Sequence, residues 1–404
     1  MKKILACLII AGIFVSSASA LTWSEAVSLA EQDSNELISA RKKLESAEWS
    51  YKRSYSSFLP QVSGSVSLSE SGSPSDKSYS YGLSASQSLF QGMAGIYGIQ
   101  SAYTDLQYTE ASLRSTRASV LYELRSAFIE VATAQENVKL SEQILKQRQD
   151  NTCLIQLRYD SGKEDKGNLM GTKADEAQAK YDLASAKREL KLARLKLSQL
   201  LQRDIDEVQA ELSLKQPEEQ DITGLVSAAP AYVMAKKQLE SAQLAQQATI
   251  SEFLPSVSLR GSYSKSGSDW PPTSSSKSWS LSVSLPIFPG GSNIADRAIY
   301  GAKLAQAEED FKLAVKDLEY SLLETLEEFN SALEALEVRR ISLAAAKERA
   351  EISRVKYLNG LTTYEFWEQI ENAYIQAQKS LLTSQRSAVL AEALWYKSYG
   401  GYVK

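Results

Sequence analysis

Histidine is absent from this chain of 404 residues. The commonest general base, which is also a frequent metal ligand, is therefore missing. Only two cysteines occur, Cys7 and Cys153, and Cys7 lies in an N-terminal apolar run, so we expect no intramolecular disulfide. No arrangement of residues indicates a catalytic, cofactor-binding or metal site. With 45 basic and 49 acidic side chains, the chain also lacks the net positive charge expected of a protein that binds nucleic acid. We therefore expect neither an enzyme nor a nucleic-acid-binding protein.

Long apolar runs are missing after residue 20. The first twenty residues combine two lysines, an apolar centre from Ile4 to Val15 and the small residues Ala18-Ser19-Ala20. This pattern is typical of a secretory signal that is cleaved after Ala20. No later run reaches the roughly 18 apolar residues of a membrane helix. If the protein spans a membrane, strands must do so.

Proline is scarce, and none lies between Met93 and Leu157. An apolar seam with heptad spacing crosses that stretch and includes Val120, Leu124 and Val131. The seam predicts a coiled-coil helix roughly 100 Å long. Helices in ordinary globular domains are much shorter than this.

The same pattern occurs twice. Phe58-Leu59-Pro60 returns as Phe253-Leu254-Pro255, and a second long helical stretch covers about 293–357. Each copy reads as short helix, hairpin, long helix, turn and short helix, so we expect two short helices to stack end to end along each long one. The resulting division is a signal peptide (1–20), a first repeat (21–205, hairpin about 61–90, tip about 158–167), a connector (206–223) and a second repeat (224–404, hairpin about 256–287, tip about 356–364).

The two hairpins alternate apolar residues with serine, which predicts strands with one apolar and one serine face. The residues expected to face lipid are Tyr79, Tyr81, Leu83, Tyr263, Trp279, Leu281, Val283 and Leu285. A sheet in lipid cannot have open edges, and the smallest barrels built from one chain have about eight strands, so several chains would have to pool their strands. The alternative is a soluble four-stranded sheet lying on helices.

These features resemble the TolC family of outer-membrane efflux proteins. The resemblance rests on the opening Leu21-Thr22-x-x-Glu25-Ala26, both Phe-Leu-Pro motifs, the serine-rich hairpins and the turns at Tyr159 and Tyr357. It implies a mostly α fold with a small β part, in which a homotrimer forms a 12-stranded outer-membrane barrel that continues into a periplasmic α-helical barrel. It further implies a passive exit duct for efflux or type I secretion, working with a periplasmic adaptor protein and an inner-membrane RND or ABC exporter.

The resemblance also implies that two helical tips close the duct and dock the adaptor. The residues that this assigns are Tyr159, Asp160, Gly162, Glu164, Asp165, Tyr357, Asn359, Gly360, Leu361, Glu365 and Glu368. Some family members narrow the pore with paired aspartates, but Phe366 and Gln369 occupy those positions here. The acidic residues of the first tip are alternative gate carboxylates, and an equally good interpretation is that they are solvated turn residues.

A second hypothesis remains from the sequence. The chain could be a periplasmic structural coiled coil without a pore. Membrane fractionation and planar-bilayer conductance separate the two.

Overall fold

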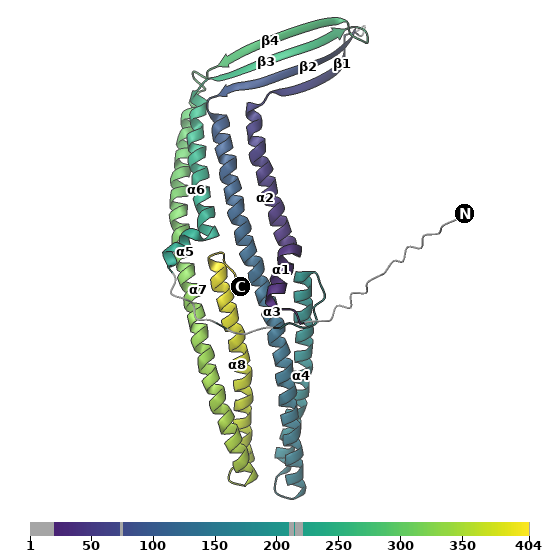
Figure 1. Ribbon diagram of the computed structural model, residues 1–404, viewed down its shortest axis with the longest axis vertical. Coiled ribbons are helices and arrows are strands. Elements are labelled where there is room, and N and C mark those ends of the chain that lie inside the picture. The colour runs from purple at the N-terminus through teal and green to yellow at the C-terminus, as the bar shows by residue number, and fades with distance from the viewer. Residues whose placement is uncertain (1–19, 73–75, 210–213, 215–220, 404) are drawn as a thin grey trace, which may run out of the picture.

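The computed structural model describes residues 20–72, 76–209, 214 and 221–403. The chain is a long helical body with a four-stranded sheet extending from one end and two helical hairpins ending at the other (Figure 1). The expected signal peptide and most of the expected connector lie outside the described residues.

The two halves of the chain have the same order of elements. The first half comprises α1 (Trp23–Asp33), α2 (Asn35–Ser54), the 3-10 turn η1 (Tyr55–Phe58), β1 (Gln61–Ser71), β2 (Asp76–Gln91), α3 (Ala94–Asp160) and α4 (Lys166–Leu201). The second half comprises α5 (Ile222–Ala228), α6 (Pro230–Ala248), η2 (Thr249–Phe253), β3 (Ser256–Gly267), β4 (Ser274–Ser284), α7 (Ser292–Leu358) and α8 (Tyr364–Ser398).

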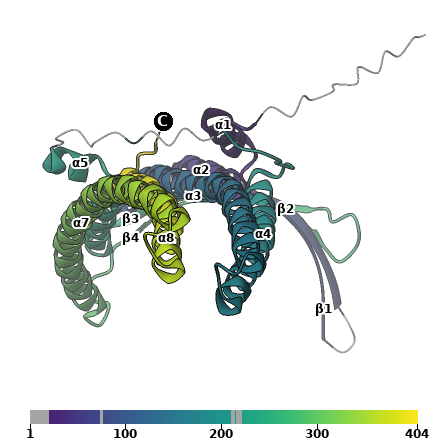
Figure 2. The same ribbon diagram turned by 90° about the horizontal axis from the view of Figure 1, so that it is seen from below.

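The two long helices, α3 and α7, confirm the prediction of coiled-coil length, with 67 residues each. Helices α2 and α4 follow one another along α3, and α6 and α8 follow one another along α7, as expected (Figure 1). Seen from below, the helices form a curved layer rather than a closed bundle (Figure 2).

The short helices are more broken than the sequence pattern predicted. One short helix was expected before the first hairpin, but the chain is extended at Ser34, whose hydroxyl accepts from the backbone N–H of Leu37 and caps α2. In the second half Ala229 is extended before Pro230, because a residue before proline is disfavoured in helical geometry. Helix α8 is capped by Thr363, whose hydroxyl accepts from the backbone N–H of Phe366.

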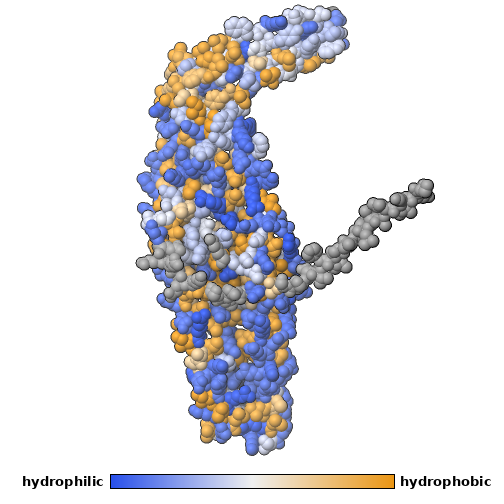
Figure 3. Space-filling view, in the orientation of Figure 1, coloured by the Kyte–Doolittle hydropathy of each residue, from blue (hydrophilic) through white to orange (hydrophobic). Residues whose placement is uncertain are grey.

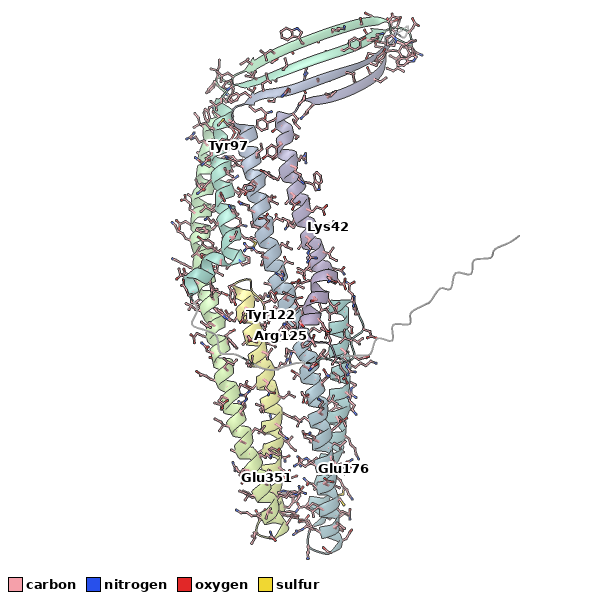
Figure 4. All side chains as sticks on the ribbon, viewed as in Figure 1. Lys42, Tyr97, Tyr122, Arg125, Glu176 and Glu351 are labelled. Carbon is pink, nitrogen blue, oxygen red and sulfur yellow. The ribbon has the colours of Figure 1, made fainter. Side chains whose placement is uncertain are left out.

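The main core lies at mid-length, where α1, α3, α4 and α8 meet. Trp23 packs edge-on against Phe128, and its indole N–H donates to the backbone carbonyl of Val403 at 2.9 Å. The guanidinium of Arg125 lies over the Trp23 ring, 4.7 Å from its centroid, and Figure 4 shows Arg125 on α3 beside Tyr122. The start and the end of the described chain are thus held on one helix.

The strands form one antiparallel sheet in the order β1-β2-β3-β4. The sheet projects away from the helices (Figure 1), and every residue of β1 and of β4 is exposed. The alternative of a sheet that lies on helices is therefore wrong. A smaller correction concerns Leu285, which was expected within a strand, because β4 ends at Ser284 and Pro286 follows. Proline lacks the N–H that would continue the ladder.

Candidate functional site: the helical tips and the strand sheet

Both helical tips end in the same turn. Gly162 and Gly360 have φ values of 69° and 72°. At the first tip, Lys163 N–H donates to the carbonyl of Arg158 at 2.8 Å, and the second tip has the equivalent bond from Leu361 to Lys356. These are Schellman endings, which glycine permits because it has no Cβ to oppose a left-handed backbone. The glycines therefore allow the chain to reverse direction sharply between the two helices of each tip.

The two tyrosines that precede these turns differ in their surroundings. Tyr159 is exposed, whereas Tyr357 is only 2% exposed. Tyr357 stacks on Trp367, with ring centroids 4.7 Å apart and planes 4° from parallel, and Tyr364 packs edge-on against both rings. Ile155 and Leu169 from the first tip complete this aromatic cluster. The cluster joins the α3–α4 hairpin to the α7–α8 hairpin.

Polar contacts reinforce the same junction. The Tyr357 hydroxyl donates to the carboxylate of Glu164, which also accepts from the Asn168 side chain at 2.9 Å. The Arg158 guanidinium lies over the Tyr357 ring at 4.6 Å. Burial, followed by the adjacent Glu164 carboxylate, raises the pKa of Tyr357, so this phenol stays protonated and able to donate.

The remaining predicted tip residues are arranged more simply. Asp165 caps α4 by accepting from the backbone N–H of Asn168 at 2.9 Å. Glu368 accepts from the Tyr364 hydroxyl at 3.1 Å. Asp160, Asn359, Leu361 and Glu365 are exposed, and hydrogen bonds, first from its own backbone N–H and then from Thr363, lower the pKa of Glu365. Of the eleven predicted residues, Glu164 and Tyr357 link the two tips through their hydrogen bond, and Glu365 also lies within hydrogen-bonding reach of Asn168 in the first tip.

Sequence analysis missed a second link, roughly two to four helical turns above the tips. Glu371 of α8 is 3% exposed and accepts from the Gln147 amide of α3. Arg148 of α3 forms an ion pair with Asp175 of α4 at 3.0 Å and donates to Asn372 of α8. Burial raises the pKa of Glu371, although the charges of Arg148 and Arg354 oppose this. The sequence offered one signal for this link: Glu371 follows Trp367 by four residues, so both lie on the same face of α8.

The sheet has two chemically distinct faces. Register places Leu83 opposite Tyr263, and Leu281 opposite Leu259, so the apolar residues of all four strands share one face. Seven of the eight predicted lipid-facing residues lie on it: Tyr79, Tyr81, Leu83, Tyr263, Trp279, Leu281 and Val283. On the opposite face, serines pair across strands, for example Ser63 with Ser84 at 2.8 Å and Ser262 with Ser278 at 2.7 Å.

Apolar surface gathers where the sheet meets the helices (Figure 3). Leu285, Ile287 and Phe288 are exposed there, Ile287 by 91%. None of the described helices is both long and apolar enough to cross a bilayer. Nor do the described residues group His, Cys, Asp or Glu side chains in a way that could hold a metal ion.

Comparison with known proteins places this architecture in a family. The model of the outer membrane efflux protein family matches residues 26–203 and again 225–401. The chain belongs to the outer membrane efflux protein family. The double match agrees with the duplicated order of elements.

Several solved structures have the same fold. Crystal structures of CusC match with a TM-score of 0.84, at 20% identity over 94% of this chain and 92% of that one. VceC of Vibrio cholerae matches with a TM-score of 0.82 at 17% identity, covering 95% of this chain and 97% of that one. The open state of MtrE of Neisseria gonorrhoeae matches with a TM-score of 0.82 at 20% identity, covering 94% and 89%. A comparison with curated protein sequences finds no match.

Family membership confirms three predictions: the resemblance itself, the duplicated α-rich fold with a small sheet, and an outer-membrane efflux channel whose helices extend into the periplasm. It also sets aside the alternative of a periplasmic coiled coil without a pore. The protein is thus an efflux component of the outer membrane.

Proposed function

We propose that three copies of the chain close a single duct, with twelve strands in the outer membrane and the curved helical layers forming the tunnel wall below. The observation that carries this proposal is the unfinished sheet. Strands β1 and β4 are unpaired edges, and the apolar residues of the four strands share one face of the sheet. Unpaired backbone groups in lipid cost several kcal/mol each, so partner copies must cover these edges.

The helical tips form the gate in this proposal. In the described arrangement, Tyr357, Glu164 and Arg158 hold the α3–α4 and α7–α8 hairpins together. Opening the periplasmic end requires these hairpins to separate, which breaks the hydrogen bond and unstacks the aromatic cluster. An adaptor that binds the exposed tip residues, including Leu361 (74% exposed), could favour the separated state.

The energy for export comes from the partner pump, because a passive duct does no work on its cargo. Two pump classes fit a passive duct, an RND exporter for efflux and an ABC exporter for type I secretion. The crystal structures that this fold matches include CmeC of Campylobacter jejuni and MtrE, which are described as outer membrane channels. This description supports the duct.

Conductance across a planar bilayer tests both the duct and its gate. The purified protein should be a trimer in detergent and should conduct. Tyr357→Phe should increase conductance, because it removes the hydrogen bond to Glu164 while keeping the ring stack. Tyr159→Phe is the matched control, since Tyr159 occupies the equivalent position in the other tip and is exposed.

Two results would contradict the proposal separately. A protein that remains monomeric and never conducts, even as Tyr357→Phe, would refute the duct. A conducting trimer in which Tyr357→Phe and Tyr159→Phe have the same conductance would refute the role of the Tyr357–Glu164 hydrogen bond in holding the gate closed.

A further inference from the structure

The serine face of the sheet is almost free of charge. The residues that share it are Gln61, Ser63, Ser65, Ser67, Ser69 and Ser71 of β1; Asp76, Ser78, Ser80, Gly82, Ser84, Ser86, Ser88 and Gln91 of β2; Ser256, Ser258, Arg260, Ser262, Ser264 and Ser266 of β3; and the even-numbered serines from Ser274 to Ser284 of β4. Within the described strands, Arg260 is the only basic residue on this face, and the only acid is Asp76, at the far end of a hairpin.

Arg260 interrupts an otherwise regular pattern. Its register neighbours are Ser86 on β2 and Ser280 on β4. The side chain is exposed, and it forms no hydrogen bond or ion pair within the described part of the chain. A hollow of about 680 Å³ opens beside it, lined among others by Gln61, Ser258 and Ser282. Arg260 therefore does not hold the sheet together through a polar contact, and its guanidinium is available to solvent and to solutes.

The position of Arg260 along the strand is also informative. It lies in the half of β3 nearer the helices, four residues after Ser256 at the strand start. Asp76 pairs with Ser71 at the opposite end of the sheet. The arginine and the carboxylate are thus far apart along the strands, well beyond the Debye length of about 10 Å at 0.1 M salt. Asp76 does not neutralise Arg260.

We propose that Arg260 forms an anion-attracting ring inside the barrel. This inference rests on the proposed trimeric duct, in which the apolar face contacts lipid and the serine face lines the lumen. Three copies then place three guanidinium groups at one level of a wall that is otherwise neutral and hydroxylated. Rings of Arg or Lys side chains select anions in pores, because they lower the electrostatic energy of an anion at that level and raise that of a cation. Small anions, and anionic groups on exported solutes, are the chemical class that this ring favours.

The reversal potential across a planar bilayer with a potassium chloride gradient tests the proposal. Arg260→Ser extends the serine pattern and removes the charge, so the reversal potential should shift toward the potassium equilibrium potential. Arg260→Lys keeps the charge and should retain most of the original preference. Lys265→Ser is the matched control, because Lys265 is on the same strand but on the apolar face, opposite Tyr81, and its loss should leave the reversal potential unchanged.

The outcomes separate this inference from the duct on which it rests. A trimer that conducts with the same reversal potential before and after Arg260→Ser refutes the ring and leaves the duct standing. An equal shift in Lys265→Ser also refutes it, because the effect would then follow net charge rather than a face of the sheet. Failure of the unaltered protein and of Tyr357→Phe to conduct refutes the duct, and the ring with it.

Discussion

At the scale of single residues, the two tips show how far identical sequence positions can diverge. Tyr159 and Tyr357 each precede a glycine turn, yet one is exposed and the other is stacked on Trp367 beneath a guanidinium. The difference arises from the neighbouring helix, since α8 carries Tyr364 and Trp367 where α4 carries no aromatic side chain in its first turns. The second tip therefore supplies the ring cluster, and the first supplies Glu164 and Arg158.

Glu371 should make the contact between α3 and α8 dependent on pH. Burial raises its pKa, so the closed tip binds this proton more tightly than an open tip that exposes the carboxyl. The contact is most stable below the ordinary carboxyl pKa of about 4.3 and weakens as pH rises through the raised value. Glu371→Gln should remove this slope from the pH dependence of thermal unfolding, measured from about pH 4 to pH 8.

Glu351→Gln provides the comparison for that experiment. Glu351 lies in the lower part of α7, the helix that pairs with α8 (Figure 4), but it is exposed and its ion-pair partner Lys347 is 4.0 Å away. Its loss should leave the slope unchanged. If Glu371→Gln and the unaltered protein have the same pH profile, the buried carboxyl does not titrate with tip closure.

At the scale of elements, local sequence signals predicted most of what the chain forms. The opening motif Thr22-x-x-Glu25 forms a capping box, in which the Thr22 N–H donates to the Glu25 carboxylate at 3.0 Å. Both glycine turns, both long helices and both hairpins also occur where the patterns indicated. The breaks at Ser34 and Ala229 were missed, because an extended residue between two helices leaves the helical period on either side almost intact.

The glycines of the chain should separate turn positions from helix positions. Gly162→Ala and Gly360→Ala force a Cβ into a left-handed backbone, which costs roughly 1–2 kcal/mol. Gly98→Ala lies within α3, where an added Cβ meets no atom within 4 Å, and should stabilise the protein by roughly 0.5–1 kcal/mol. Thermal unfolding in detergent measures both effects. Equal destabilisation by all three substitutions would show that backbone conformation is not the cause.

At the scale of the whole molecule, the chain is an incomplete object. Its sheet has two open edges and one apolar face, its helices form a curved layer (Figure 2), and apolar surface gathers where the two meet (Figure 3). Long helices bury residues outside the predicted seam, such as Leu121, Phe128 and Ile129, because α3 contacts neighbours on several sides. The heptad seam was therefore too narrow a description of the core.

Assembly in the membrane should depend on which face of β4 is changed. Leu281→Arg places a charge on the apolar face, where a lipid-exposed arginine near the bilayer centre costs about 2–4 kcal/mol. It should reduce the yield of trimer extracted from membranes. Ser282→Arg, one residue further on the serine face, should assemble far better. If the two variants give equal yields, lipid does not contact the apolar face.

The sequence by itself determined the elements and their faces: helical and twofold periods, serine against apolar positions, glycine turns and the internal duplication are all local properties of the chain. Only the tertiary structure decided which side chains meet between the repeats. The Tyr357–Glu164 hydrogen bond, the buried Glu371 and the isolation of Arg260 each depend on how elements far apart in the chain are placed against one another. Period and composition carry no information on that placement, because the same amphipathic helices could pack in several registers.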